Sequence, residues 1–304
     1  MADFASRSME RLACFAAVGD HPGSRTFERG PAFRLWAIPC GVLVMTVSRD
    51  DALVSIIMPL FNSERFVGET LDSVLAQTYG NWELVVVDDC STDRSPDIVK
   101  AFSQRDGRDR VRLYSLASNQ GAAKARQAAL SYVSGDYIAY LDSDDVWLPR
   151  KLERQLEFME GEGAAMCFTG YETIEEDGAH RNVVHVPGSM RYKDFLKQTI
   201  TCSHTIMFDL ERVPLDLLSE VRDVPYDYPE DLDTWLRVLK TGIVARGIDE
   251  PLAKYRRHDG SRSAAKTKAV ARTWNQYTRN EGLNPLYSAY CLFWQLTHAV
   301  LKRI

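Results

Sequence analysis

Short apolar runs alternate with segments whose apolar residues recur every three or four positions between residues 54 and 159. Each unbroken apolar run predicts a buried strand, and we expect strands over residues 54–58, 84–87, 111–114 and 137–141. The helical spacing predicts helices over residues 63–77, from 95 or 97 onward, over 121–133 and from 149 to 159. Buried strands separated by helices are typical of a parallel sheet covered on both faces, so we predict an α/β fold.

The pattern changes after Ala164. We predict short strands over residues 165–171, 205–208, 243–248 and 252–255, and a short helix over 232–239. Two helices should close the chain, a basic one over 264–280 and an apolar one over 286–301. These changes divide the chain into residues 1–51, 52–163, 164–262 and 263–304.

Residues 1–51 follow no sustained period, and we predict a disordered or non-native extension in which Met45 is an alternative start. Their apolar stretch, residues 32–47, is interrupted by Arg34 and Pro39 and is too short to span a bilayer. A signal peptide is a weaker interpretation, because the apolar run begins late and no small-residue cleavage site closes it.

Composition narrows the class of protein. The chain has 304 residues, of which 45% are hydrophobic and 26% charged, as in an ordinary soluble globule. A net charge of -5 disfavours nucleic acid as a partner. The six cysteines form no C-x-x-C pair, which favours reduced thiols in the cytoplasm over disulfides or a zinc site.

Acidic side chains gather at three places. Asp142-Ser143-Asp144-Asp145 directly follows the strand over 137–141, Asp88-Asp89 follows the strand over 84–87, and Glu230-Asp231-Leu232-Asp233 opens a predicted helix. Carboxylates held close together raise each other's pKa or recruit a cation. Several oxygen ligands suit Mg²⁺ or Mn²⁺, which keep positions open for phosphate oxygens.

The carboxyl ends of parallel strands form the ligand-binding edge of such a sheet, so Asn62, Asp88, Asp89 and the acids of 142–145 should converge there. A simpler interpretation treats single acids as turn or helix-capping residues. That interpretation suits Asp88 and Asp89 and the first-turn acids Glu230 and Asp231, which favour the helix dipole anyway. It fits three acids at the end of one buried strand poorly, so we predict a metal–nucleotide enzyme.

Four segments carry a family resemblance: "VSIIMPLFNSERFVGETLDSVLAQTYGNWELVVVDDCSTDRS", "NQGAAKARQAAL", "GDYIAYLDSDDVWLPRKLERQ" and "EDLDTWLRVLKTG". In this order they resemble glycosyltransferase family 2 from about Val54 to His258, and most resemble bacterial enzymes that build teichuronic acid and other surface polysaccharides. The resemblance implies the glycosyltransferase A fold, with a Rossmann-like, mostly parallel sheet and added C-terminal helices. It also implies a nucleotide-sugar donor of the UDP type, a divalent cation (Mg²⁺ or Mn²⁺) and inversion at the anomeric carbon. Residues 52–163 would bind the nucleotide sugar and residues 164–262 the acceptor.

Site residues follow from the resemblance position by position. Asp231 matches the catalytic base, with Asp233 as its rival, and Asp142 and Asp144 match the metal-binding D-x-D pair. His258 is assigned as a further metal ligand, although an ordinary surface histidine would also fit, and Arg256 could add charge near the diphosphate. The nucleotide-sugar site would comprise Pro59, Asn62, Asp88, Asp89, Lys124, Asp142 and Ser143, with Asp89 at the uracil and Asp88 supporting its loop. The usual "ARN" here reads Ala125-Arg126-Gln127, and we interpret Arg126 as a structural ion-pair partner.

The apolar helix over 286–301 has two interpretations. It either packs on the core or lies in the inner membrane interface, where lipid-linked saccharide acceptors reside. Gln295 and His298 argue against a helix that spans the bilayer. We therefore expect a cytoplasmic protein with peripheral contact to the inner face of the membrane through residues 286–304.

Three functions remain to be separated. The first is an inverting, metal-dependent glycosyltransferase, and the second a nucleotide-sugar-binding module without turnover. The third is a phosphotransfer protein, because "VVVDD" at the end of a strand resembles a phosphoacceptor pocket, but the lysine such a pocket requires is not found. A dinucleotide oxidoreductase is set aside because no G-x-G-x-x-G follows the first strand. We predict the first function.

Overall fold

The computed structural model describes residues 33–37, 43–47, 51–198, 202–258 and 266–301. The chain divides into two units, residues 1–51 and 52–304. In the first unit, β1 (Phe33–Ala37) and β2 (Leu43–Val47) form an antiparallel pair. The rest of the predicted extension lies outside the described residues, so its disordered or non-native character stays a prediction, as do the boundaries at 163 and 262.

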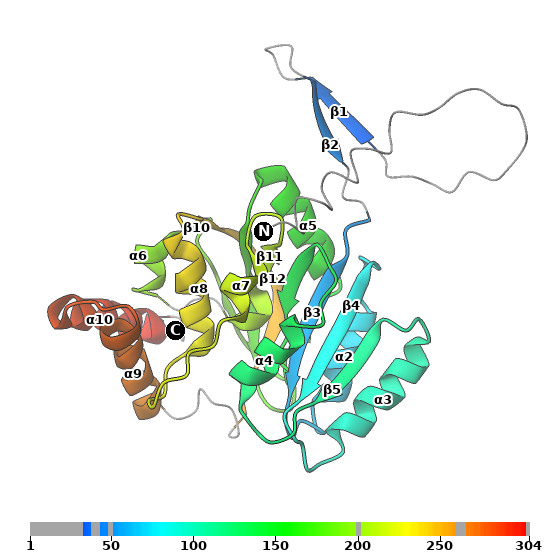
Figure 1. The fold of residues 1–304 in the computed structure, drawn as a ribbon, viewed down its shortest axis with the longest axis horizontal. Coiled ribbons are helices and arrows are strands. Elements are labelled where there is room, and N and C mark those ends of the chain that lie inside the picture. The colour runs from blue at the N-terminus through cyan, green and yellow to red at the C-terminus, as the bar shows by residue number, and fades with distance from the viewer. Residues whose placement is uncertain (1–32, 38–42, 48–50, 199–201, 259–265, 302–304) are drawn as a thin grey trace, which may run out of the picture. The chain divides into compact units, whose positions relative to one another are not determined.

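A ten-stranded sheet organises the second unit (Figure 1). Its first half is parallel, in the order β6-β3-β4-β5. The bounds are β3 Val54–Leu60, β4 Trp82–Asp88, β5 Val111–Ser115 and β6 Tyr137–Tyr140. All four strands lie where the apolar runs predicted them, and their parallel pairing confirms the α/β fold.

The second half of the sheet is mixed. From β6 the order continues β11 (Met207–Asp209), β8 (Met166–Ile174), β12 (Ala245–Arg256) and β10 (Ser189–Met190); β9 (His180–Val184) pairs with β8, and β7 (Val146–Trp147) with β12. The two strands predicted over 243–255 are one strand, β12, whose register against β8 shifts on both sides of Pro251. A proline cannot donate to the ladder, and a bulge accommodates it without ending the strand.

Helices cover both faces of the sheet because successive residues of each strand point to opposite sides. Ile56, Met58, Leu84 and Val86 share one apolar cluster with α2, α3 and α5, whereas Ile57, Val85 and Val87 share the other with α4, α7 and α8. The bounds are α2 Val67–Leu75, α3 Ser95–Asp106, α4 Ala122–Leu130, α5 Lys151–Glu162, α6 Tyr192–Phe195, α7 Leu215–Ser219 and α8 Glu230–Lys240.

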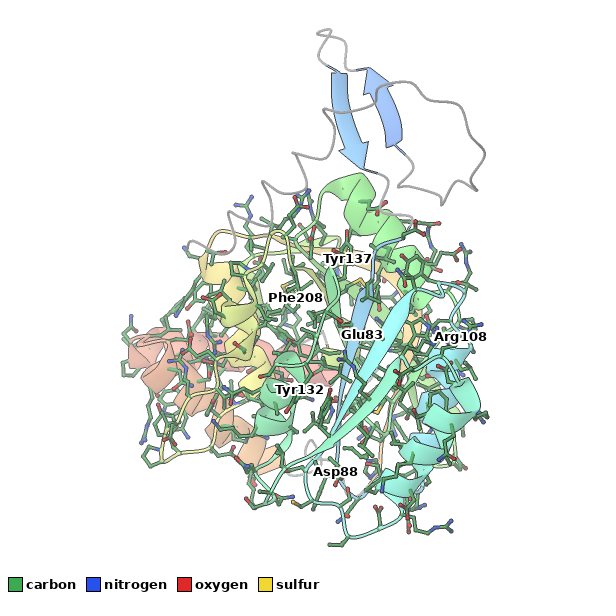
Figure 2. The ribbon with its side chains drawn as sticks, turned by 45° about the vertical axis from the view of Figure 1, so that its right-hand side comes forward. Glu83, Asp88, Arg108, Tyr132, Tyr137 and Phe208 are labelled. Carbon is green, nitrogen blue, oxygen red and sulfur yellow. The ribbon has the colours of Figure 1, made fainter. Side chains whose placement is uncertain are left out.

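The chain closes with α9 (Lys266–Asn275), a π-helical turn over Gln276–Asn280, and α10 (Pro285–Leu301), which lie beside α8 in Figure 1. The predicted basic helix began at residue 264, outside the described residues. Figure 2 shows Asp88 at the carboxyl end of β4 and Glu83 near its opposite end. The carboxyl end is the edge at which the predicted site residues are expected.

Candidate active site

At the carboxyl end of the sheet, the loop that follows β3 contacts the loops that follow β4 and β6. Asn62 has a left-handed backbone (φ 46°), which asparagine tolerates better than most residues, and its Oδ1 accepts a hydrogen bond from the Thr92 amide at 2.8 Å. The hydroxyls of Ser63 and Ser143 lie 2.7 Å apart. The loops after β3, β4 and β6 therefore meet, as the fold class predicted.

Pro59 sits in β3, a central strand, where proline is unusual. The carbonyl oxygen of Ile57 accepts a hydrogen bond from the amide of Leu141. Residues two apart in a strand direct their backbone N–H and C=O groups to the same side, so the backbone nitrogen of Pro59 also points toward β6. The pairing of β3 with β6 ends at Ile57 and Tyr140, so the missing N–H of Pro59 removes no ladder bond. Pro59 therefore lies where β3 has separated from β6 but is still paired with β4.

Asp88 and Asp89 are both buried and both bind backbone amides. Asp88 accepts a hydrogen bond from Ser91 N within its own turn, at 3.1 Å. Asp89 reaches the start of α4, where its two oxygens accept from Gln120 N at 2.6 Å and Gly121 N at 2.7 Å. Gly121 has φ 87°, which a side chain would strain. In this structure, then, Asp88 orders its loop and Asp89 joins β4 to α4.

Arg126 joins two of the acidic clusters. From the middle of α4 its Nη2 lies 2.5 Å from Asp142 Oδ1, and its Nη1 lies 3.5 Å from Glu230 Oε1 at the start of α8. Burial alone would lower the pKa of Arg126, but Asp142, Glu230 and Asp231 raise it above its usual value. The interpretation of Arg126 as an ion-pair partner therefore holds, and its partners are two predicted site clusters.

Asp144 faces His258, which follows β12. His258 Nε2 lies 2.9 Å from Asp144 Oδ2, so two predicted metal ligands are in contact. Burial, and then the neighbouring carboxylates of Asp145 and Asp142, raise the pKa of Asp144 to about 6, while His258 lowers it. The charged form of Asp144 is therefore disfavoured at this position, despite the contact with His258.

Asp145 and Arg256 hold the acidic loop, residues 142–145 after β6, in place. Asp145 Oδ1 accepts from the Arg256 amide at 2.9 Å, and its Oδ2 lies 2.6 Å from Nδ1 of the fully buried His204, in the 3-10 turn η1 (Ser203–Thr205). The Arg256 guanidinium donates to the carbonyls of Asp144 and Glu176 and pairs with Glu69. Arg256 is 2% exposed, so as placed it braces the loop.

Asp231 and Asp233 point in different directions from α8. Asp231 lines a cavity together with Arg126, Tyr140 and Ser203. Asp233 is 1% exposed and binds inward, to Arg222 Nε at 2.9 Å, Arg237 Nη2 at 2.6 Å and Gln276 Nε2 at 2.8 Å. Residues two apart on a helix point to different sides. The described contacts thus separate the two candidates for the base.

Lys124 lies on another face of α4 from Arg126. Its Nζ donates to Gln127 Oε1 at 3.2 Å, and with Gln120 and Leu116 it lines an open groove beside the helix. Its predicted contact with the nucleotide sugar stays a prediction.

Several site residues were not found by sequence reasoning. Ser203, Tyr140 and Glu230 line the cavity beside Asp231, and His204 contacts Asp145. Of these residues, only Glu230 stands out in the sequence, because it belongs to the acidic cluster that opens the predicted helix beside Asp231. Tyr140 is the last residue of a buried strand, and Ser203 and His204 lie in a short turn, where no pattern separates a core residue from a site residue.

Among the residues that the structure describes, no three His, Cys, Asp or Glu side chains are positioned together to hold a metal ion. Asp144 and His258 are in contact, whereas Asp142 is turned toward Arg126. Nor does any helix of the described part of the chain have the length and apolar character needed to cross a bilayer.

The fold is that of the glycosyltransferase A class. S. aureus TarS 1-349 in complex with UDP-GlcNAc superposes with a TM-score of 0.60 at 17% identity, covering 79% of this chain and 70% of that one. The mannosyltransferase PcManGT from Pyrobaculum calidifontis, in complex with GDP-Man and Mn²⁺, gives a TM-score of 0.57 at 18% identity, covering 79% and 68%. At these identities the likeness speaks for the fold alone.

The sequence comparisons identify the family. The model of Glycosyl transferase family 2 matches residues 55–211. The chain is 40% identical over 253 residues to the putative teichuronic acid biosynthesis glycosyltransferase TuaG of Bacillus subtilis (strain 168), covering 83% of this chain and 98% of the relative. It is 37% identical over 227 residues to the Escherichia coli UDP-Glc:alpha-D-GlcNAc-diphosphoundecaprenol beta-1,3-glucosyltransferase WfgD, covering 74% and 85%.

The chain therefore belongs to glycosyltransferase family 2 and is a glycosyltransferase. The predicted resemblance is confirmed, and the enzyme is preferred over the phosphotransfer protein and the binding module without turnover.

Proposed function

We propose that the enzyme transfers a sugar from a UDP-sugar to a hydroxyl of a glycan or lipid-linked saccharide in bacterial cell-surface polysaccharide biosynthesis, with inversion at the anomeric carbon. The similarity to TuaG, a putative teichuronic acid biosynthesis glycosyltransferase, and to WfgD, a UDP-Glc glucosyltransferase that acts on a diphosphoundecaprenol-linked sugar, supports this substrate class. The observation that carries the proposal is the Arg126 bridge, which brings the start of α8, with Asp231, next to the acidic loop after β6.

Asp231 is the proposed general base. It takes the proton of the acceptor hydroxyl while that oxygen attacks the anomeric carbon and the bond to the diphosphate breaks. A single displacement of this kind inverts the anomeric centre and releases UDP. The cavity location of Asp231 supports this role, and the three inward contacts of Asp233 argue that Asp233 fixes α8 instead.

Asp142, Asp144 and His258 are the proposed residues that hold Mg²⁺ or Mn²⁺. The fit rests on charge: burial, and then the neighbouring carboxylates of Asp145 and Asp142, raise the pKa of Asp144 to about 6, and a divalent cation relieves the repulsion among these acids. Two carboxylates and an imidazole are a suitable donor set for Mn²⁺. When bound, the cation would neutralise the diphosphate of the leaving group.

The remaining predicted residues form the proposed nucleotide pocket. Pro59, Asn62 and Ser143 lie at the carboxyl ends of the parallel strands β3 and β6, and Asp88 orders the loop that carries Asp89. The carboxylate of Asp89 already binds two backbone amides, so its proposed contact with uracil would be shared with the start of α4.

The test combines binding with turnover. A thermal-shift screen of UDP-glucose, UDP-N-acetylglucosamine, UDP-galactose and GDP-mannose, with and without MnCl₂, should identify a donor whose binding needs the metal. Asp231→Asn should keep that shift and lose transfer by about 10²- to 10⁴-fold. Asp233→Asn is the matched control, which should lower the melting temperature and keep transfer. Full transfer by Asp231→Asn refutes the assigned base.

A further inference from the structure

The hydroxyl of Tyr140 is buried and has no hydrogen-bond partner in the part of the chain that the structure describes. Tyr140 ends β6 two residues before Asp142, and its ring packs edge-on against Trp235, with centroids 5.1 Å apart. The residue is 3% exposed, and among the described residues no group forms a hydrogen bond with its Oη. A buried hydroxyl in this state carries a desolvation cost that a ligand can remove.

Arg126, which lines the cavity beside Tyr140, also has a buried polar atom without a partner among the described residues. The terminal nitrogens of Arg126 bind Asp142 and Glu230, but its Nε has no hydrogen-bond partner in the described part of the chain. Arg126 and Tyr140 both line the cavity that also contains Asp231. Two residues that line the cavity of the proposed base therefore each have a buried polar atom without a hydrogen-bond partner among the described residues.

The cavity measures about 30 Å³ and is bounded on one side by the exposed Glu220, so it opens toward solvent. Its size suits a water molecule or a single hydroxyl group. The Arg126 Nε–H requires a hydrogen-bond acceptor, which excludes a hydrocarbon group and a bare cation, because neither can accept a hydrogen bond. A hydroxyl satisfies both atoms, because it can accept from Arg126 and exchange a hydrogen bond with Tyr140.

We propose that Tyr140 Oη and Arg126 Nε bind a second hydroxyl of the acceptor sugar, next to the hydroxyl that Asp231 deprotonates. The inference rests on the proposed function and deepens it, because it assigns an acceptor-positioning role to two residues of the donor half.

Tyr140→Phe tests the proposal, because it removes only the oxygen atom. UDP release is measured with the donor from the thermal-shift screen, in water alone and with a panel of methyl hexosides and methyl N-acetylhexosaminides. We expect kcat/KM for the best acceptor glycoside to fall by about tenfold, with the KM for the donor and the release in water unchanged. Tyr137→Phe, which removes a hydroxyl near the other end of the same strand, is the control and should keep all three values (Figure 2).

Deoxy analogues of that acceptor separate the sugar from water. For the analogue that lacks the bound hydroxyl, wild type and Tyr140→Phe should have the same kcat/KM, because the interaction is already absent. Equal kcat/KM of the two proteins on every acceptor, or no glycoside that accelerates UDP release, overturns the proposal. Absence of any donor shift or UDP release in water would instead overturn the proposed function.

Discussion

Replacing Arg126 by methionine removes the positive charge between two acidic clusters and keeps most of the apolar stem. Asp142, Glu230 and Asp231, which raise the pKa of the Arg126 guanidinium, would then face one another without it. We expect Arg126→Met to destabilise the fold strongly in the absence of metal. We expect Mn²⁺ to restore part of the loss.

The magnitude follows from the geometry. With an effective dielectric constant of about 20, charges separated by 2.5 Å and 3.5 Å attract each other by about 7 and about 5 kcal/mol. The Arg126 side chain is 14% exposed, so desolvation offsets much of this attraction. Breaking a pair as buried as this costs about 3–5 kcal/mol, because the acids are left uncompensated.

Mn²⁺ changes the balance because Asp142 is a proposed metal ligand. In wild type the cation competes with Arg126 for this carboxylate, and in Arg126→Met it does not. Each tenfold gain in affinity adds about 1.4 kcal/mol of stability when the metal is in excess. The free energy of unfolding of Arg126→Met should therefore rise by at least about 1.4 kcal/mol more on addition of Mn²⁺ than that of wild type does.

Urea denaturation with EDTA and with MnCl₂ measures both effects. The control is Arg272→Met, because Arg272 also pairs with Glu230, at 3.3 Å, and is 16% exposed, but its other described partners are Asp227 and the Tyr228 carbonyl. That variant should lose stability and gain no more from Mn²⁺ than wild type. The reasoning is refuted if Arg126→Met loses less than about 1 kcal/mol, or if Mn²⁺ stabilises all three proteins equally.

Two further predictions concern regions outside the active site. Burial lowers the pKa of Lys151 to about 7, so between pH 7 and its unfolded value near 10.5 the unfolded chain binds more protons and the stability of the fold rises with pH. Lys151→Met should therefore be the more stable protein at pH 7, with an advantage that shrinks by about 2 kcal/mol by pH 9; urea midpoints at both pH values check this, and a constant difference contradicts it. For the proposed membrane contact, α10 carries no Asp, Glu, Lys or Arg and exposes Leu286, Tyr290 and Phe293. Replacing all three by serine should abolish flotation with anionic liposomes, whereas a serine triple variant at the exposed Leu75, Tyr132 and Leu215 should still float; equal flotation of the two variants ends this proposal.

The parallel half of the fold was predictable because its signals are local. An unbroken apolar run such as Leu84–Val87 requires burial on both faces, and the helices beside it show their period directly. The mixed half was less predictable. β9 and β10 have no apolar pattern of their own; β9 pairs with the neighbouring β8, whereas β10 pairs with β12, far along the chain. The residues around Pro251 appeared to break a strand that the structure continues with a bulge.

The site was predictable where charge follows a strand. Acids after β4 and β6 must lie at one edge of a parallel sheet, and contacts among their loops confirm that they do. The choice between Asp231 and Asp233 could not be made from the sequence, because both occupy the first turn of one helix. It depends on Arg222, Arg237 and Gln276, which reach Asp233 from three different segments.

The acidic loop after β6 explains how these segments meet. Each of its acids has its own partner from a different element: Asp142 binds Arg126 on α4, Asp144 contacts His258 after β12, and Asp145 lies against His204 in η1. The protein's own groups thus offset the repulsion that the sequence predicted, and they tie the two halves of the domain to one loop. The offset is incomplete at Asp144, whose pKa remains raised to about 6, so a cation bound at this loop would gain most beside that carboxylate.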